Sequence, residues 1–227
     1  MLHLTPLFLI SAIPALLLSL YASWVTRSTF NKYSKVVAKN GMTGAQSARL
    51  MLEKNGVYDC KIEPVSGFLS DHYDPRSKTL RLSEKVYSAN SLSAIGVACH
   101  EAGHALQHAN GYAFLSFRSA LVPLVGFTSN LSYLVISLGF IFRPFLLVGC
   151  AIFAISALFA IVTLPVEWDA SARAKKAMLT AGLLSPEETH HAGKVLNAAF
   201  LTYLAGAIST ILTLLEYLYR AGFFNRK

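Results

Sequence analysis

Four long stretches of mostly apolar residues dominate the pattern of hydrophobic and polar positions along the chain. They cover residues 4–25, 119–142, 144–164 and 196–219. Each stretch is long enough to cross a hydrocarbon core of about 30 Å as a helix. We therefore expect four membrane-spanning helices. Only the Arg143-Pro144 pair marks the junction between the second and third spans, so these two spans should form a tight hairpin.

Two other stretches, residues 26–118 and 165–195, are polar enough to fold in water. In the first of them, Thr43 and Gln46 have the spacing of a capping box, which predicts a helix that ends at Gly56. An apolar run from residue 92 to residue 99 predicts a second helix, which continues beyond the run and is stopped by Gly111.

Between these two helices, β-branched and aromatic residues alternate with turn residues. This pattern predicts extended segments that form a small antiparallel sheet, at Val57–Val65, Phe68–Ser70 and Thr79–Ser83. The chain is thus expected to be one domain over residues 1–227. Its predicted class is a mainly α integral membrane protein with about four transmembrane helices and a small α+β cytoplasmic lobe.

The most informative short motif is His100-Glu101-Ala102-Gly103-His104, which lies in the second predicted helix. Two histidines four residues apart on a helix point the same way, so both imidazoles can reach one metal ion. Glu101 lies on the same broad face and can take a proton from a water without acting as a ligand. Burying three ionisable groups without a partner or a metal is costly. The HExxH helix therefore predicts a zinc site rather than a chance pattern in a buried helix.

A catalytic zinc site needs a third protein ligand and one open position. His108 would lie about 6 Å further along a continuing helix than His104, so we expect it beside the metal and not on it. Glu167 is the better candidate, because it follows Pro165 at an expected helix start directly after the third span. Two membrane crossings separate it from His100, which puts both residues on the same side. The alternative for Glu167 is a solvated carboxylate at a helix N-terminus.

Composition agrees with a membrane location, since 54% of the 227 residues are hydrophobic and only 14% are charged. This is too apolar for an ordinary soluble domain of this size. The net charge is +8, and basic residues gather after the first and third spans. We therefore expect an inner or plasma membrane protein whose two polar stretches face the cytoplasm. These basic residues are Arg27, Lys32, Lys35, Lys39, Arg173, Lys175, Lys176 and Lys194.

Two further features of the composition bear on the expected partners and on the redox state of the compartment. No basic stripe is interleaved with aromatic residues, so nucleic acid is not an expected partner. The three cysteines, Cys60, Cys99 and Cys150, show no paired spacing, as expected in a reducing compartment.

Five segments of the chain together match the pattern of a known family: Asp71–Arg76, Leu80–Ser83, His100–His104, Pro165–Ala174 and Ser185–Glu188. They resemble the bacterial neutral zinc metallopeptidases of the YugP type. The resemblance covers nearly the whole chain and implies an integral membrane peptidase with a zincin-like lobe, distantly similar to the gluzincin group that includes the HtpX and Ste24 proteases. In gluzincins an aspartate four residues after the glutamate ligand commonly orients a histidine ligand. Here that position is Ser171, with Asp169 two residues after Glu167, and either could take this role.

The expected activity is zinc-dependent hydrolysis of peptide bonds in a peptide or protein substrate. Zn²⁺ would be held by His100, His104 and Glu167, and Glu101 would be the general base. The other expectation is a catalytically idle zinc-binding membrane scaffold or partner-binding protein, whose closed site would look similar in sequence. A carrier or channel is disfavoured, because the spans contain almost no ionisable residues.

Residues before and after the site helix are candidates for supporting roles. His72 and Tyr73, with Arg173 as another candidate, could stabilise the oxyanion of the reaction. Leu80–Ser83 could be an edge strand that receives the substrate backbone, or it could simply close the sheet.

Overall fold

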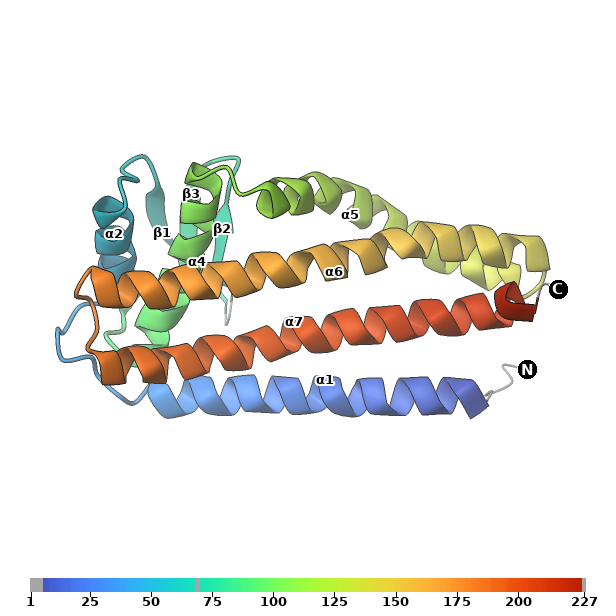
Figure 1. Ribbon diagram of the computed structural model, residues 1–227, viewed down its shortest axis with the longest axis horizontal. Helices are drawn as coiled ribbons and strands as arrows, with labels where there is room; N and C mark the ends of the chain where they lie inside the picture. Colours follow the sequence, from blue (N-terminus) through green and yellow to red (C-terminus); the bar gives the residue numbers. More distant parts are fainter. Residues whose placement is uncertain (1–5, 68–69, 226–227) are drawn as a thin grey trace. The chain divides into compact units, whose positions relative to one another are not determined.

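The computed structural model describes residues 6–67 and 70–225, and helices make up most of its elements (Figure 1). The chain divides into two compact units. The helical unit comprises residues 1–23, 117–164 and 202–227, and the mixed unit comprises residues 24–116 and 165–201. The elements in chain order are α1 (Pro6–Tyr33), α2 (Gly44–Lys54), β1 (Lys61–Val65), β2 (His72–Asp74), β3 (Thr79–Ser83), α3 (Glu84–Ser88), α4 (Leu92–Ala109), α5 (Ala113–Gly139), α6 (Arg143–Thr180), α7 (Pro186–Arg220) and the 3-10 helix η1 (Phe223–Asn225).

Among the described residues, α1, α5, α6 and α7 are long and apolar enough to cross a membrane. Each predicted span falls largely on one of these helices, although residues 4 and 5 of the first span lie outside the described residues. Large side chains of α1 point outward, as in Ile10, which is 68% exposed. A helix that presents apolar side chains all round is stable only in apolar surroundings. The prediction of four membrane-length helices is confirmed.

The connection between α5 and α6 is as tight as the sequence predicts. Only residues 140–142 separate the two helices. Gly139 ends α5, and a Cβ atom there would lie 2.5 Å from the backbone nitrogen of Leu146. Glycine therefore lets the two helices approach each other directly after the turn.

One expectation about α6 is wrong. Pro165 does not start a new helix, because α6 runs unbroken from Arg143 to Thr180 and contains it. Proline costs a helix one backbone hydrogen bond, but membrane-length helices tolerate this loss. The third predicted span and Glu167 therefore belong to one helix.

Helices α2 and α4 pack against each other and form much of the core of the mixed unit. The predicted capping box at the start of α2 is confirmed, since Thr43 accepts from the backbone N–H of Gln46 and Gln46 accepts from that of Thr43. Helix α4 is buried along most of its length. It ends before Gly111, which has a φ of 62° and stops the helix as predicted.

A three-stranded sheet with the order β1-β3-β2 lies beside α4 in the mixed unit (Figure 1). Strand β2 is antiparallel to β3, but β1 is parallel to β3. The predicted antiparallel sheet is therefore wrong in one pairing. The first strand, β1, is shorter than the expected Val57–Val65. The second strand lies at His72–Asp74 and not at Phe68–Ser70: Ser70 is not part of a strand, and residues 68 and 69 lie outside the described residues.

The position of β3 overturns a second expectation. Leu80–Ser83 belongs to the central strand, which is paired on both sides and cannot receive a substrate backbone. The reason is burial: Leu80 and Leu82 are fully buried, so the most apolar strand takes the centre of the sheet. Strand β1 carries Pro64, which has no N–H to donate and is suited to an edge.

Helix α4 lies close to the backbone of α6 at Gly103. A Cβ atom at Gly103 would lie 2.6 Å from the carbonyl oxygen of Ala170. We expect Gly103→Ala to lower the free energy of unfolding by about 1–3 kcal/mol, because backbone of α6 cannot move aside without repacking. Thermal unfolding of the purified protein in detergent measures this change.

Gly96→Ala is the matched control on the same helix. A Cβ atom there would meet Ala192 at 3.4 Å, an ordinary contact. We expect this variant to be at least as stable as the natural protein, because alanine favours helix over glycine by about 1 kcal/mol. Equal losses of stability in both variants would contradict the conclusion that the backbone of α6 leaves no room for a side chain at position 103.

Candidate metal centre

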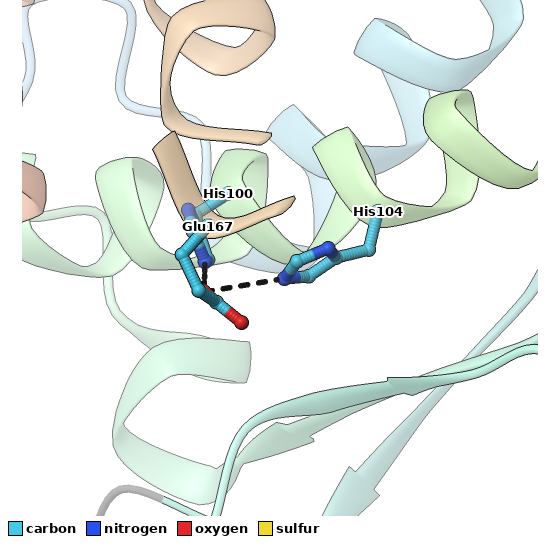
Figure 2. Close-up of side chains that lie close together, drawn as sticks. All are labelled: His100, His104 and Glu167. Atoms are coloured by element: carbon cyan, nitrogen blue, oxygen red, sulfur yellow. Dashed lines mark hydrogen bonds and ion pairs between the residues drawn. The ribbon is translucent and has the colours of Figure 1, made fainter. Parts of the chain in front are cut away.

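Two histidines of α4 and one glutamate of α6 converge in the mixed unit (Figure 2). The Nε2 atom of His100 lies 3.1 Å from Oε2 of Glu167, and the Nε2 atom of His104 lies 3.6 Å from the same oxygen. Among the described residues these three form the one cluster of His, Cys, Asp or Glu side chains that could hold a metal ion. His100, His104 and Glu167 were all predicted as ligands, and the structure brings them together.

The local fold explains why the three side chains meet. His100 and His104 lie one turn apart on the same side of α4, as their spacing requires. Glu167 lies on α6 three residues before Ala170, the residue that contacts Gly103. The close crossing of the two helices therefore brings the carboxylate to the imidazoles.

The donor set suits zinc, and the two separations between nitrogen and oxygen are close to those of zinc ligands. Tetrahedral zinc with bonds of about 2.0–2.1 Å places its ligand atoms about 3.3 Å apart. The two nitrogen-to-oxygen distances of 3.1 and 3.6 Å lie on either side of this value. Glu167 is 1% exposed and His104 is 6% exposed, so a cation between them would offset the cost of burying the carboxylate.

Charge at the site favours a cation. Burial by itself would lower the pKa of His104, but hydrogen bonding and attraction from Glu167 outweigh it. The carboxylate of Glu101 adds a further attraction, and together they raise the pKa of His104 above its ordinary value. The protein therefore stabilises positive charge beside this ring, whether a proton or a metal ion supplies it.

The other nitrogen of each ligand histidine has its own hydrogen-bond partner. The Nδ1 atom of His100 lies 3.0 Å from Oγ of Ser171, and the Nδ1 atom of His104 lies 2.9 Å from Oε1 of Gln107. Asp169 does not contact a histidine directly but accepts a hydrogen bond from Gln107. The sequence left open whether Ser171 or Asp169 supports a ligand histidine. In the structure Ser171 contacts His100 directly, and Asp169 is linked to His104 through Gln107.

Gln107 was not among the residues that the sequence pointed to. The signal available was its position, three residues after His104 and directly after the apolar pair Ala105-Leu106. A polar side chain at such a position needs a partner when buried. Which partner it finds depends on α6, which lies about 60 residues further along the chain.

The remaining predicted residues lie outside the cluster of three ligands and differ in how far they are buried. Glu101 is half-buried on α4, next to His100. His108 lies one turn beyond His104, and its Nδ1 atom is 2.8 Å from the hydroxyl of Tyr73 on β2. His108 is therefore outside the three-residue cluster, as its distance along the helix predicted.

His72 and Tyr73 face opposite sides of β2, because successive side chains of a strand alternate. Tyr73 is partly buried, and burial raises the pKa of its hydroxyl above the ordinary value. His72 is exposed and donates a hydrogen bond from Nδ1 to the carbonyl of Ser70. Arg173, the third candidate, donates to Asp169 and lies over the ring of Tyr112.

Comparison with known proteins assigns the chain to a family. It belongs to the family described as "Putative neutral zinc metallopeptidase", whose model matches residues 8–222. Among curated proteins it is similar to "Putative membrane protease YugP" of Bacillus subtilis (strain 168), with 45% identity over 213 residues, 93% of this chain and 95% of the relative. No solved structure matches. The resemblance noted in the sequence is confirmed.

The family description and the cluster agree with each other. The family is described as one of zinc metallopeptidases, and the chain brings together three side chains close enough to bind one metal ion. The relative is named as a membrane protease, which supports a membrane location together with the four apolar helices.

Removing a ligand should remove the metal. We expect His104→Ala and Glu167→Gln to purify with far less zinc than the natural protein, because two protein ligands hold zinc poorly. His108→Ala is the matched control, since this histidine lies one turn away and contacts Tyr73 instead. Metal content measured by atomic emission after purification checks the prediction. Loss of zinc in the His108 variant alone would show that the ligand set is wrong.

Proposed function

We propose that this protein is a zinc-dependent membrane endopeptidase. The observation that carries the proposal is the convergence of two imidazole Nε2 atoms and one carboxylate oxygen, from His100, His104 and Glu167. Two histidines and a glutamate are the ligands of a well-known class of catalytic zinc sites. The family description and the name of the relative support the same activity.

A zinc ion held by these residues would lower the pKa of a water molecule and polarise the peptide carbonyl. Glu101 acts as the general base: its carboxylate takes a proton from the water and then passes it to the leaving nitrogen. Its position supports this role, because it is half-buried beside His100 and lies outside the ligand cluster.

The donor that stabilises the oxyanion is Tyr73 in this proposal, with His72 as the second candidate. The hydroxyl of Tyr73 contacts His108, which follows His104 on the same side of α4. His72 lies on the opposite face of β2 and is exposed. A phenol hydroxyl is a suitable donor, since burial keeps Tyr73 protonated.

The number of ligands favours a hydrolase over a zinc-binding scaffold. A structural zinc site is closed by four protein ligands, whereas a catalytic one keeps a position open. In the part of the chain that the structure describes, the cluster has three members. Of the residues that could close it, His108 contacts Tyr73 and Asp169 contacts Gln107.

The site faces the cytoplasm in this proposal, and residues 1–227 work as one membrane domain. Residues 26–118 and 165–195 carry the eight basic residues that follow the first and third spans. Positive residues are retained on the cytoplasmic side of bacterial and plasma membranes. The substrate is then a peptide or protein segment that reaches this side of the bilayer.

Replacing Glu101 should separate chemistry from metal binding. We expect Glu101→Gln to keep its zinc and to lose about 10²–10⁴-fold in peptide cleavage, because an amide cannot accept the proton. Casein or a quenched fluorescent peptide, with the protein in detergent or vesicles, gives the rate.

Glu53→Gln is the matched control, because Glu53 is exposed on α2 and takes no part in the site. It should cleave at the natural rate. If the natural protein binds zinc but neither it nor the Glu101 variant cleaves any peptide tested, the scaffold is the better description.

The two oxyanion candidates can be compared directly. We expect Tyr73→Phe to lower kcat about 100-fold with little change in KM, because the lost donor acts on charge that develops in the transition state. His72→Ala should have a smaller effect. Steady-state kinetics of both variants decides between them, and a larger loss in the His72 variant would reverse the assignment.

A further inference from the structure

A chain of polar side chains lies behind His104, away from Glu167. Gln107 is fully buried and is in contact with His104 on α4 and with two acceptors on α6. We propose that Gln107 is a positioning residue that fixes which nitrogen of His104 can bind the metal, and that Asp169 and Arg173 hold it in this role. This inference rests on the proposed zinc site.

The orientation of the Gln107 amide follows from its neighbours. Its Nε2 atom lies 2.8 Å from the carbonyl oxygen of Val166 and 2.8 Å from Oδ2 of Asp169. A backbone carbonyl and an ionised carboxylate can only accept hydrogen bonds. The NH₂ group of Gln107 must therefore face them, because the opposite orientation would set three oxygen acceptors against one another.

This orientation determines which ring nitrogen of His104 carries the proton. Because the NH₂ group of Gln107 donates to α6, its Oε1 atom faces His104 and lies 2.9 Å from Nδ1. Oε1 can only accept, so Nδ1 must carry a proton. The lone pair of the neutral ring is then on Nε2, the atom that faces Glu167. The hydrogen bond on one ring nitrogen thus selects the other as the ligand.

The two ligand histidines differ in this respect. His100 is held through Nδ1 by the hydroxyl of Ser171. A hydroxyl can donate or accept, so Ser171 positions the ring without fixing its proton. The tautomer of His104, in contrast, is fixed by a group that has only one way to bond.

Asp169 and Arg173 keep the amide from turning over. Arg173 donates from Nε to Oδ2 of Asp169, the same oxygen that accepts from Gln107. The guanidinium also lies over the ring of Tyr112, at 5.6 Å, and the backbone N–H of Tyr112 donates to the carbonyl of Gln107. The oxygen that accepts from Arg173 therefore also accepts from Gln107, and it offers the amide no donor.

The first test is the affinity for Zn²⁺, measured by competition with a chromophoric chelator on the full-length protein in detergent. Gln107→Met keeps the length of the side chain and removes its polar end, so we expect zinc to bind about 10–100-fold more weakly. Gln46→Met is the matched control, because Gln46 belongs to the capping box of α2. This control should change thermal stability and leave zinc affinity as in the natural protein.

The second test exchanges donor and acceptor. Gln107→Glu places an oxygen against Asp169 and should weaken zinc binding. Adding Asp169→Asn gives a double variant with the same net charge as the natural protein. The amide introduced at position 169 can donate to the new carboxylate, so the double variant should recover part of the zinc affinity. The absorption bands of bound Co²⁺ should change in Gln107→Glu and return toward the natural spectrum in the double variant, which a role in stability alone does not predict.

The outcomes separate this inference from the function on which it rests. If the natural protein binds no zinc, both the positioning role of Gln107 and the proposed peptidase function are wrong. If it binds zinc and Glu101→Gln behaves as expected, natural zinc affinity in Gln107→Met overturns the positioning role alone. Should Gln107→Met fail to fold, the comparison of Gln107→Glu with the double variant decides, and the role falls if the second change recovers no affinity.

Discussion

The close crossing of α4 and α6 is the constraint on which the candidate site depends. Gly103 has no side chain, and the backbone of Ala170 occupies the place where one would lie. Because the crossing point falls between the two histidines of α4 and close to Glu167 on α6, all three side chains reach one point. A larger residue at Gly103 would separate the helices, and the nitrogen and oxygen atoms would no longer lie at the spacing of zinc ligands.

The buried polar groups at this crossing satisfy one another in two layers. The layer between the helices consists of the three ligand side chains, and the layer behind it consists of Ser171 and Gln107. Each histidine therefore has one nitrogen toward Glu167 and one toward a neutral partner. This division lets two imidazoles and a carboxylate lie in an otherwise apolar core without an unpaired polar group among them.

Much of the fold and the three residues of the cluster could be predicted from the sequence, because they follow from local rules and from the order of the apolar segments. The length of an apolar run predicts a membrane-length helix, and four-residue spacing places His100 and His104 together. Glu167 could be predicted as a ligand because the number of membrane crossings limits which segments lie on the same side of the membrane. The position of β3, the place of Pro165 inside α6 and the partners of Gln107 depend on contacts between distant segments, which no local pattern contains.

The helical backbone of α6 ties the direction of a ligand to the point where α6 meets α4. Glu167 lies on the same unbroken helix as the third span, three residues after Leu164. In a loop, an inserted or deleted residue is absorbed by slack backbone. In a helix, each one turns everything beyond it by about 100°. A residue inserted between Glu167 and Ala170 would thus turn the carboxylate away from the imidazoles, because the backbone of Ala170 is packed against Gly103.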